Sequence, residues 1–315
     1  MATAEAVFNV HAVIVSFNPD IDVLNKCLAQ LEPQVQKIYV VDNYSENIES
    51  VKGTTATYRT VELISLKINA GLGRAHNVGI KHAKDDGASH VLILDHDSIP
   101  STRMVANMID VLQDLNTKKK PIAAVGARYL GRHAGNESFF VQFGWAKFRR
   151  VFCSEGGKRY VRVDFLISSG SLISLASLND IGEMDEGLFI DHIDTDWFLR
   201  ANWRGYHSYG ACDALMEHGL GEQTYRMWFG RWRYLPKHKP FRYYYIFRNS
   251  ILLYKRSYAP MKWIINDIIR LLFIVAFYSL VSESRVEITK MIARGIVDGL
   301  RGITGERITP SKATC

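Results

Sequence analysis

Carboxylates gather at two places in the chain where the surrounding residues are apolar. Asp191, Asp194 and Asp196 fall within six residues of the stretch "GLFIDHIDTDWFLR", among Phe, Ile and Trp side chains. Asp95 and Asp97 close the apolar run "HVLILDHDS". Carboxylates are costly to bury and mostly stay at the surface. Acids threaded through apolar segments are therefore the first candidates for proton transfer or metal binding.

The pair Asp95 and Asp97 has the spacing of a divalent-metal site at the end of a strand. The two carboxylates could share one ion, or one could hold the ion and the other a ribose hydroxyl. Hard oxygen ligands suit Mg²⁺ or Mn²⁺. His218, in "LMEHGLGE", could complete the metal shell. Two alternatives remain open, a helix N-cap for the pair and a structural or surface role for His218.

The second group divides by spacing. Asp196 and Arg200 are four residues apart, which predicts an ion pair that holds a helix. Asp191 and Asp194 are three apart and lack a comparably spaced cation. They are the better candidates for an open site, in which one of them acts as a general base. The spacing does not decide between the two.

The elements that must position these acids alternate between strand and helix. Apolar runs predict strands at 10–18, 37–42, 61–66, 90–97 and 163–174, and helical spacing predicts helices at 20–31, 73–87, from about 102, and at 193–203. Buried strands alternating with helices indicate an α/β fold with a parallel sheet covered on both faces. Ligands bind at the carboxyl ends of such strands, which places Asn18, Asp42 and Asp95 around one crevice.

Two further segments are candidates for nucleotide binding. Asp42 ends a strand and could accept a hydrogen bond from a nucleobase or a ribose, although an Asx turn is the alternative. The segment "NAGLGRAHNVG" contains Asn69, Gly71 and Gly73, and its glycines would let the backbone approach a ligand closely. An ordinary loop before a helix is the alternative here. The segment matches neither a P-loop nor a dinucleotide fingerprint.

Composition limits the class of protein. With 315 residues and 47% apolar content, the chain can build a sizeable core and is not disordered. The four cysteines form no CxxC pair, which argues against a zinc site and a disulfide framework and favours a reducing compartment. The N-terminus has no basic leader before its apolar run, so we expect no secretory signal.

Charge is distributed unevenly. Up to Leu220 there are 22 Lys and Arg against 26 Asp and Glu, a net of −4, and beyond it there are 17 against 6, a net of +11. A basic region can face nucleic acid or an anionic membrane, and the apolar content here favours the membrane. Because the uninterrupted apolar run Leu271–Val281 is too short to span a bilayer, we expect an interfacial helix. Its expected anchors are Trp263, Phe273, Phe277 and Tyr278. A buried helix and a dimer contact are the alternatives.

Taken in order, these motifs resemble the family 2 glycosyltransferases of the GT-A fold. The matching segments are "VIVSFN", "VVDNYS", "NAGLGRAHNVGI", "LILDHDS", "FLISSGSLIS" and "FIDHIDTDWFLR", and the match runs from about 10 to 218 and continues over 242–253. "SFNP", "LDHDS", "FLISSG" and "FIDHIDTDW" look most like the bacterial rhamnosyltransferase branch, whose members transfer L-rhamnose from dTDP-L-rhamnose. The resemblance implies a Rossmann-like, mostly parallel sheet flanked by helices over 1–220. A basic, mainly helical, membrane-associating region over 221–315 would follow it.

The resemblance also implies roles for single residues. The nucleotide sugar would be held by Phe17, Asn18, Asp42, Asn69, Gly71 and Asp95, and the metal by Asp95, Asp97 and His218. Asp194 falls where the family has its general base. This sequence departs from the family pattern because Ile193, not an acid, precedes Asp194, and Asp191 is an additional acid. Asp191 would then orient the acceptor or the base.

The implied activity is inverting, metal-dependent rhamnosyl transfer to a lipid-linked acceptor such as a polyprenyl-diphosphate sugar, in O-antigen or rhamnan biosynthesis. The enzyme would be cytoplasmic, peripheral on the inner face of the bacterial cell membrane, with no nucleic-acid partner, and its oligomeric state stays open. Cations available to an anionic headgroup or the acceptor's diphosphate are Arg231, Arg233, Lys237 and Lys239. Alternatives are a UDP-hexose donor, a rhamnolipid-type acceptor, or a non-catalytic membrane-associated binding module. A sugar nucleotidyltransferase would want a Gly-rich, Arg-containing loop that "SFNPDID" lacks.

Overall fold

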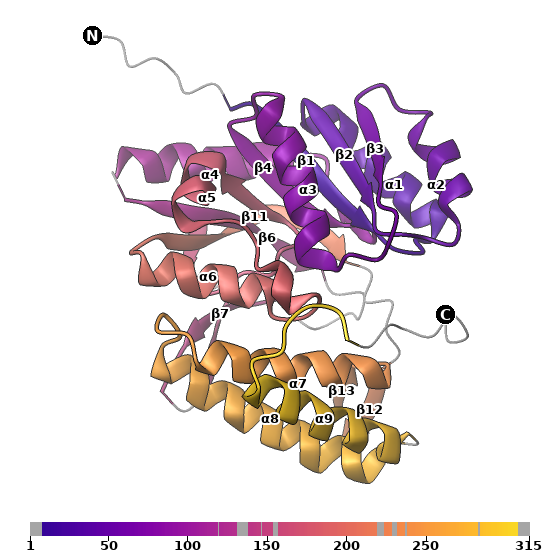
Figure 1. The fold of residues 1–315 in the computed structure, drawn as a ribbon. Coiled ribbons are helices and arrows are strands. Elements are labelled where there is room, and N and C mark those ends of the chain that lie inside the picture. Colours follow the sequence, from indigo (N-terminus) through magenta and orange to yellow (C-terminus); the bar gives the residue numbers. More distant parts are fainter. Residues whose placement is uncertain are drawn as a thin grey trace.

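A nine-stranded sheet forms the centre of the protein in the computed structural model (Figure 1). The structure describes residues 8–118, 120–130, 138–145, 147–153, 157–218, 224–228, 232–236, 238–282 and 284–307. The strand order is β3-β2-β1-β4-β10-β6-β11-β5, with β9 paired to β11. The strands are β1 (Val10–Ser16), β2 (Lys37–Asp42), β3 (Val61–Ser65), β4 (His90–Asp95), β5 (Ser98–Pro100), β6 (Ile122–Leu130), β9 (Tyr160–Val163), β10 (Ser171–Ser174) and β11 (His207–His218).

The first four strands of the sheet are parallel, as predicted. Their registers place Asp42 of β2 beside Ser16 of β1, and Asp95 of β4 beside Val15 on the other side of β1. The carboxyl ends of these three strands therefore meet at one edge. The sequence expectation of a mostly parallel α/β sheet is confirmed.

The segment 163–174 is not the single strand that was predicted. β9 ends at Val163, residues 164–170 loop back, and β10 begins at Ser171 as an antiparallel strand between β4 and β6. Gly170 makes this turn with a φ of 77°, and a Cβ there would lie 2.6 Å from the sulfur of Met216. The apolar pattern is continuous because both ends of the segment are buried, although they belong to different strands.

Helices cover both faces of the sheet. They are α1 (Ile21–Leu31), α2 (Ile48–Thr55), α3 (Leu72–Asp85), α4 (Met104–Thr117), α5 (Leu175–Ile181) and α6 (Ile193–Trp203), with short 3-10 turns η1 (Glu32–Gln34) and η2 (Glu186–Leu188). One apolar core lies under α1 and α4, and the other under α3, α5 and α6. The predicted ends of α3 and α6 at glycine are confirmed, because Gly87 and Gly205 have left-handed backbone angles there.

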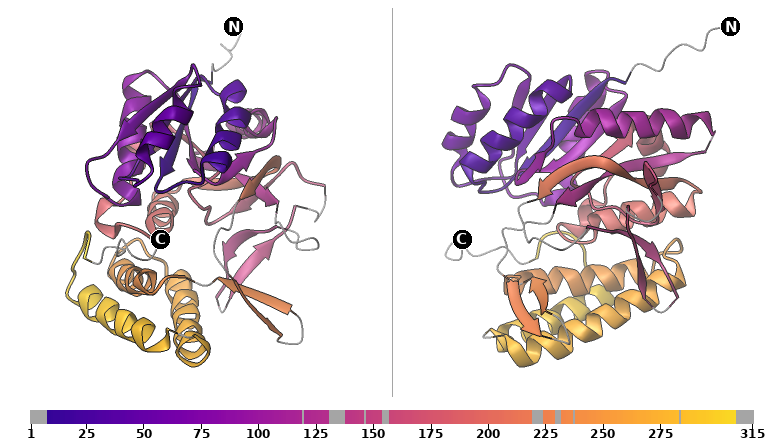
Figure 2. Two further views of the ribbon diagram at one scale, coloured as in Figure 1. Left: turned by 90° about the vertical axis from the view of Figure 1, so that its right-hand side faces the viewer. Right: turned by 180° about the vertical axis from the view of Figure 1, so that it is seen from behind.

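A layer of three helices follows the sheet domain in the chain and lies beneath it (Figures 1 and 2). These are α7 (Pro240–Tyr254), α8 (Met261–Val281) and α9 (Arg285–Leu300). α7 and α9 pack closely because Gly295 has no side chain. A Cβ at this position would lie 2.4 Å from the carbonyl oxygen of Tyr244. Two hairpins, β7 (Phe140–Phe143) with β8 (Phe148–Val151) and β12 (Thr224–Trp228) with β13 (Trp232–Pro236), were not predicted. The expectation of a mainly helical C-terminal region holds for 240–300.

A disulfide joins Cys153 to Cys212, with their Cα atoms 5.5 Å apart. The sequence argument against disulfides is therefore wrong for this pair. The two cysteines are 59 positions apart in the sequence, and the pairing of β9 with β11 brings this part of the chain next to Cys212. With this bond in place, the cysteines no longer indicate a reducing compartment.

The predicted anchors of an interfacial helix are mostly wrong. Trp263, Phe277 and Tyr278 are buried, and of the four only Phe273 is exposed. In the part of the chain that the structure describes, no helix is long and apolar enough to cross a membrane. The buried aromatic side chains of α8 pack on α6, α7 and α9, so another face of α8 is left to solvent.

Candidate active site

The edge formed by the carboxyl ends of β1, β2 and β4 carries the first group of predicted residues. Asp42 is 1% exposed and accepts hydrogen bonds from the Ser16 hydroxyl at 3.0 Å and the Ser45 backbone N–H at 2.9 Å. This is the turn alternative that the sequence left open. Asn18, with a φ of 47°, joins the same turn, since its N–H donates to the Ser45 hydroxyl. Phe17 is partly buried beside it.

Asn69 and Gly71 lie next to this turn. The Asn43 amide donates to Oδ1 of Asn69 at 2.9 Å, and the same oxygen accepts from the Gly71 N–H at 3.1 Å. A Cβ on Gly71 would lie 2.6 Å from both the ring and the carbonyl oxygen of Phe189. Gly71 is therefore required for close packing against Phe189. From the sequence, the glycine had been explained by the approach of a ligand instead.

Asp95 and Asp97 lie at the turn from β4 to β5, both partly exposed. They are not the N-cap of a helix, since α4 begins at Met104 with Arg103 as its cap. The Asp95 N–H donates to the Ser169 hydroxyl at 3.0 Å. Two carboxylates on one turn are hard oxygen donors of the kind that Mg²⁺ and Mn²⁺ prefer.

The third predicted metal ligand is brought to the same turn by the backbone. His218 pairs with Ser98, the residue that follows Asp97. The side chain of His218 lies outside the described part of the structure, as do those of Arg231, Arg233 and Lys237. Among the described residues, no three His, Cys, Asp or Glu side chains come together as a metal site.

Asp194 is partly exposed, unlike the buried Asp196, and it lies within electrostatic reach of Asp95. It lies in the first turn of α6, where its Oδ1 accepts the Thr195 N–H at 2.7 Å. The pKa of Asp194 is raised to about 6, first by burial and also by the charges of Asp191 and Asp95, while hydrogen bonds from the Thr195 and Ser168 backbone oppose the shift. A carboxylate that titrates near neutrality is suited to accept a proton.

The segment around Ser168 links the two groups of acids. The Ser168 backbone bonds to Asp194, and the neighbouring Ser169 hydroxyl accepts from Asp95. Tyr129 of β6 adjoins both acids, since burial and then the charges of Asp95 and Asp194 raise its pKa well above the ordinary value. The sequence reading missed Tyr129, because its contacts come from the pairing of β6 within the sheet.

Asp191 is not the unpaired acid that its sequence spacing suggested. Its Oδ1 lies 2.6 Å from a guanidinium nitrogen of Arg242, which is 51 residues away on α7. Burial alone would raise the pKa of Asp191, but the Arg242 charge and hydrogen bonds outweigh it, and the pKa lies below the ordinary value. Asp191 is therefore a fixed anion, and Asp194 is the acid poised to gain and lose a proton.

The predicted pair of Asp196 and Arg200 is confirmed at 2.9 Å within α6. Asp196 is fully buried and also accepts from the Tyr258 hydroxyl. Arg200 donates to the carbonyl of Ile181 at 3.0 Å. This pair joins α6 to its neighbours and serves structure.

Two buried polar residues of α7 hold the loop that carries the acids. The Asn249 amide nitrogen lies 2.8 to 2.9 Å from the carbonyl oxygens of Leu188, Ile190 and Asp191. The Arg248 guanidinium also donates to the Leu188 carbonyl, at 2.8 Å. This clasp is needed because three non-glycine residues of the loop, Phe189, Asp191 and His192, have left-handed backbone angles. In the sequence, the only sign of this clasp is the polar pair Arg248 and Asn249 within the otherwise largely apolar helix α7.

We expect Asn249→Ala to lower the free energy of unfolding by about 2–3 kcal/mol, because it removes the side-chain donor from the carbonyls of Ile190 and Asp191 and leaves a space in a buried helix. Urea denaturation followed by circular dichroism measures the loss. Asn179→Ala, at an exposed position on α5, is the matched control and should cost little. Equal losses in the two variants would show that the clasp does not hold the loop.

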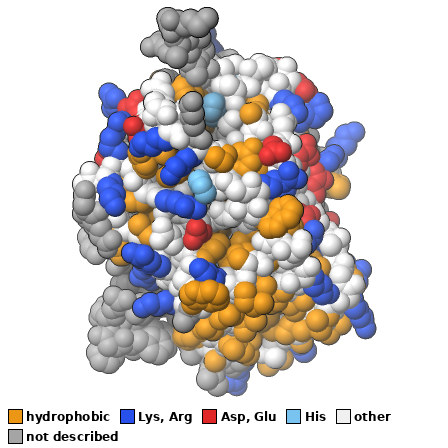
Figure 3. Space-filling model, turned by 90° about the vertical axis from the view of Figure 1, so that its left-hand side faces the viewer, with side chains coloured by type: hydrophobic (Ala, Val, Ile, Leu, Met, Phe, Trp, Pro, Cys, Tyr) orange, Lys and Arg blue, Asp and Glu red, His pale blue; other side chains and the backbone are white. Residues whose placement is uncertain are grey.

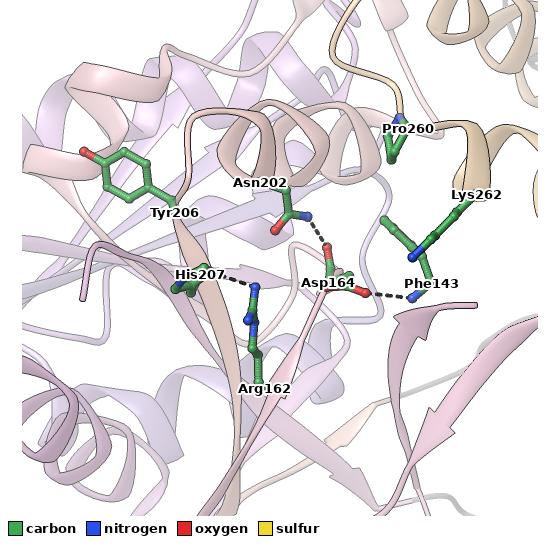
Figure 4. A pocket seen from close by; sticks show the side chains of 8 residues that line it. All are labelled: Phe143, Arg162, Asp164, Asn202, Tyr206, His207, Pro260 and Lys262. Atoms are coloured by element: carbon green, nitrogen blue, oxygen red, sulfur yellow. Dashed lines mark hydrogen bonds between the residues drawn. The ribbon is translucent and has the colours of Figure 1, made fainter. Parts of the chain in front are cut away.

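The cavity drawn in Figure 4 is lined by none of these acids. It has a volume of about 210 Å³ and is lined by Phe143, Arg162, Asp164, Asn202, Tyr206, His207, Pro260 and Lys262. His207 is the first residue of β11 and pairs with Ile122 at the start of the parallel strand β6. The cavity is therefore at the opposite edge of the sheet from Asp95, and we do not assign it to the reaction.

Known proteins resemble the chain in sequence and in fold. The profile of Glycosyl transferase family 2 matches residues 12–157. A protein of Shigella flexneri named dTDP-rhamnosyl transferase RfbF is 28% identical over 297 residues, which cover 94% of this chain and 97% of the relative.

Two solved structures share the fold at low identity. The structure of GalNAc-T7 with UDP, GalNAc and Mn²⁺ matches with a TM-score of 0.60 at 13% identity, over 95% of this chain and 57% of that one. S. aureus TarS in complex with UDP-GlcNAc matches with a TM-score of 0.58 at 14% identity, over 94% of this chain and 81% of that one.

Proposed function

We propose that the chain, a glycosyltransferase whose residues 12–157 match Glycosyl transferase family 2, transfers L-rhamnose from dTDP-L-rhamnose. The proposed acceptor is a hydroxyl of a lipid-linked sugar such as a polyprenyl-diphosphate glycan, in bacterial O-antigen or rhamnan assembly. The similarity to a dTDP-rhamnosyl transferase over nearly the full length of both chains carries the choice of donor. We assign donor binding and catalysis to residues 1–220, and membrane association to 221–315.

The proposed reaction is a single displacement at the anomeric carbon. Asp194 takes the proton of the acceptor hydroxyl, whose oxygen forms a bond to the anomeric carbon as the bond to the diphosphate oxygen breaks. The diphosphate leaves with the bonding electron pair. Attack from the face opposite the leaving group inverts the centre, so a β-L donor gives an α-L-rhamnosyl product. Asp191, held by Arg242, orients the acceptor and keeps a negative charge near Asp194.

The donor side is assigned to the opposite part of the crevice. Phe17, Asn18, Asn69 and Gly71 would line the nucleotide pocket, and Asp42 would act by holding the turn beneath it. Asp95, Asp97 and His218 would hold Mg²⁺ or Mn²⁺, a use of metal that the Mn²⁺ complex of a structural neighbour supports. When bound, the ion neutralises charge that develops on the leaving diphosphate.

We expect kcat/KM to rise with pH through about 6 and to level off above it, following the pKa of Asp194. A general base must be deprotonated to accept a proton. With a raised pKa, Asp194 is largely protonated below about pH 6 and largely deprotonated above it. Initial rates between about pH 5 and pH 8 measure the profile. A rate that stays flat across this range would argue that Asp194 does not titrate in the free enzyme.

A second candidate has the same chemistry with a UDP-hexose donor, which the structural match to TarS with UDP-GlcNAc favours. A panel of dTDP-L-rhamnose, UDP-galactose and UDP-GlcNAc, each assayed for release of nucleoside diphosphate, separates the two. We expect turnover of dTDP-L-rhamnose alone. Rapid turnover of a UDP-hexose and none of dTDP-L-rhamnose would refute the proposed donor.

A further inference from the structure

α8 presents an unpartnered apolar stripe along one side. Its exposed residues recur at helical spacing, and all those whose side chains the structure describes are apolar: Met261, Ile265, Ile268, Ile269, Leu272, Phe273, Val275 and Ala276. Leu272 is 64% exposed and Ile269 is 50% exposed. Apolar side chains accordingly gather over the lower part of the face in Figure 3, with Lys and Arg at the margins. A continuous stripe of this kind indicates a surface that meets something other than water.

A second element adds an aromatic side chain beside the stripe. The tip of the β7–β8 hairpin approaches α8, where the Asn266 amide donates to the Gly144 carbonyl at 2.7 Å. Trp145, the next residue, is 67% exposed, and the Lys262 amine lies 4.8 Å from its ring centre. Tryptophan at an exposed tip, next to a cation and an apolar helix face, is typical of side chains that settle at a membrane–water interface.

The charges of the hairpin and of α8 are mostly positive. The segments 140–151 and 261–281 contain five cations and one acid, a net of +4. The acid, Asp267, is buried and bonded to Arg270. Lys147, Arg149 and Arg150 project from the hairpin into solvent.

These charges decide between two possible occupants of the surface. A second copy of the chain placed face to face would bring two such clusters together, and like charges across an interface oppose association. An anionic bilayer attracts the same cations and accepts the apolar side chains between them.

We propose that the α8 stripe and the Trp145 hairpin tip form a surface that docks on an anionic membrane, with α8 lying in the plane of the interface. The surface differs from the anchors expected from sequence, three of which are buried, and it includes a hairpin that the sequence did not predict. The proposal deepens the membrane association that we assign to 221–315 by naming its surface, and it is independent of the transfer reaction because docking requires neither donor nor acceptor.

Flotation of the full-length protein with vesicles tests this surface. Vesicles of phosphatidylcholine alone are compared with vesicles that also contain phosphatidylglycerol, at low and high salt. We expect binding to the anionic vesicles that weakens as salt rises, because the charge contribution is screened. The double variant Ile268→Ser, Leu272→Ser is expected to lower the partition coefficient about tenfold or more, since two apolar side chains that would enter the bilayer are lost.

Two tryptophans provide a matched comparison on separate elements. Trp145→Ser should weaken binding several-fold, whereas Trp203→Ser, at an equally exposed side chain at the end of α6, should not change it. Wild-type binding by both the double variant and Trp145→Ser would overturn the proposal. The proposal would also be overturned if the wild-type protein did not bind the vesicles and sedimented as a dimer while the double variant sedimented as a monomer. A failure of donor turnover would leave these results unaffected.

Discussion

Asp194→Asn is expected to lower kcat for transfer by roughly 10²–10⁴-fold, the range that a general base contributes. The amide keeps the size and the hydrogen bond to the Thr195 N–H, but it cannot take a proton at neutral pH. The affinity for dTDP-L-rhamnose should stay near the wild-type value, because Asp194 is assigned to the acceptor. Steady-state transfer assays, with donor binding measured by calorimetry, separate the two effects.

Asp191→Asn is the matched control for this variant. It weakens the ion pair with Arg242 but leaves Asp194 in place, so we expect a smaller loss of kcat. The acid limb of the pH profile should persist in Asp191→Asn and disappear from the residual activity of Asp194→Asn. If Asp191→Asn were the more damaging of the two, the base would have to be reassigned to Asp191.

Asp97→Asn has the second large expected effect. Removing one carboxylate from the turn between β4 and β5 should weaken metal binding. The activation free energy of transfer should rise by several kcal/mol, which lowers the rate on the order of 10²–10³-fold. Added Mn²⁺ should tighten the binding of dTDP-L-rhamnose to the wild type and have little effect on the variant. Asp85→Asn, on an exposed Lys81–Asp85 pair of α3, controls for the loss of one surface charge. Wild-type transfer and wild-type Mn²⁺ dependence in Asp97→Asn would remove Asp97 from the metal site.

The sequence predicts the parts of the fold that are encoded locally. β1, β2 and β4 are continuous apolar runs that end in polar residues, and the helix of Ile193–Trp203 has both its internal ion pair and its glycine end in the sequence. The meeting of Asp42 and Asp95 on either side of β1 follows from parallel pairing alone. These features need only the period of the apolar residues and the chemistry of the turns.

Contacts between distant segments could not be predicted in this way. Arg242 reaches Asp191 across 51 residues, and Cys153 meets Cys212 across 59. The Asn249 clasp likewise depends on how α7 packs against the loop. Spacing within one segment carries no information about such pairs, because the sheet and the helical layer bring them together.

The three acids of the stretch from Gly187 to Arg200 consequently separate by their partners. Asp196 forms an ion pair within α6, and Asp191 is an anion paired with Arg242 of α7. Asp194 has a raised pKa. The apolar neighbours keep Asp194 partly dry, which is the cause of that shift.

The central claim is inverting rhamnosyl transfer to a lipid-linked sugar. Its most direct test is incubation of the full-length enzyme with dTDP-L-rhamnose and a small panel of polyprenyl-diphosphate-linked sugars, followed by determination of the anomeric configuration and linkage by NMR. We predict an α-L-rhamnosyl product on at least one acceptor, formed by wild type and lost in Asp194→Asn. A β-L product, or no transfer of rhamnose to any acceptor while a UDP-hexose is transferred, would contradict it.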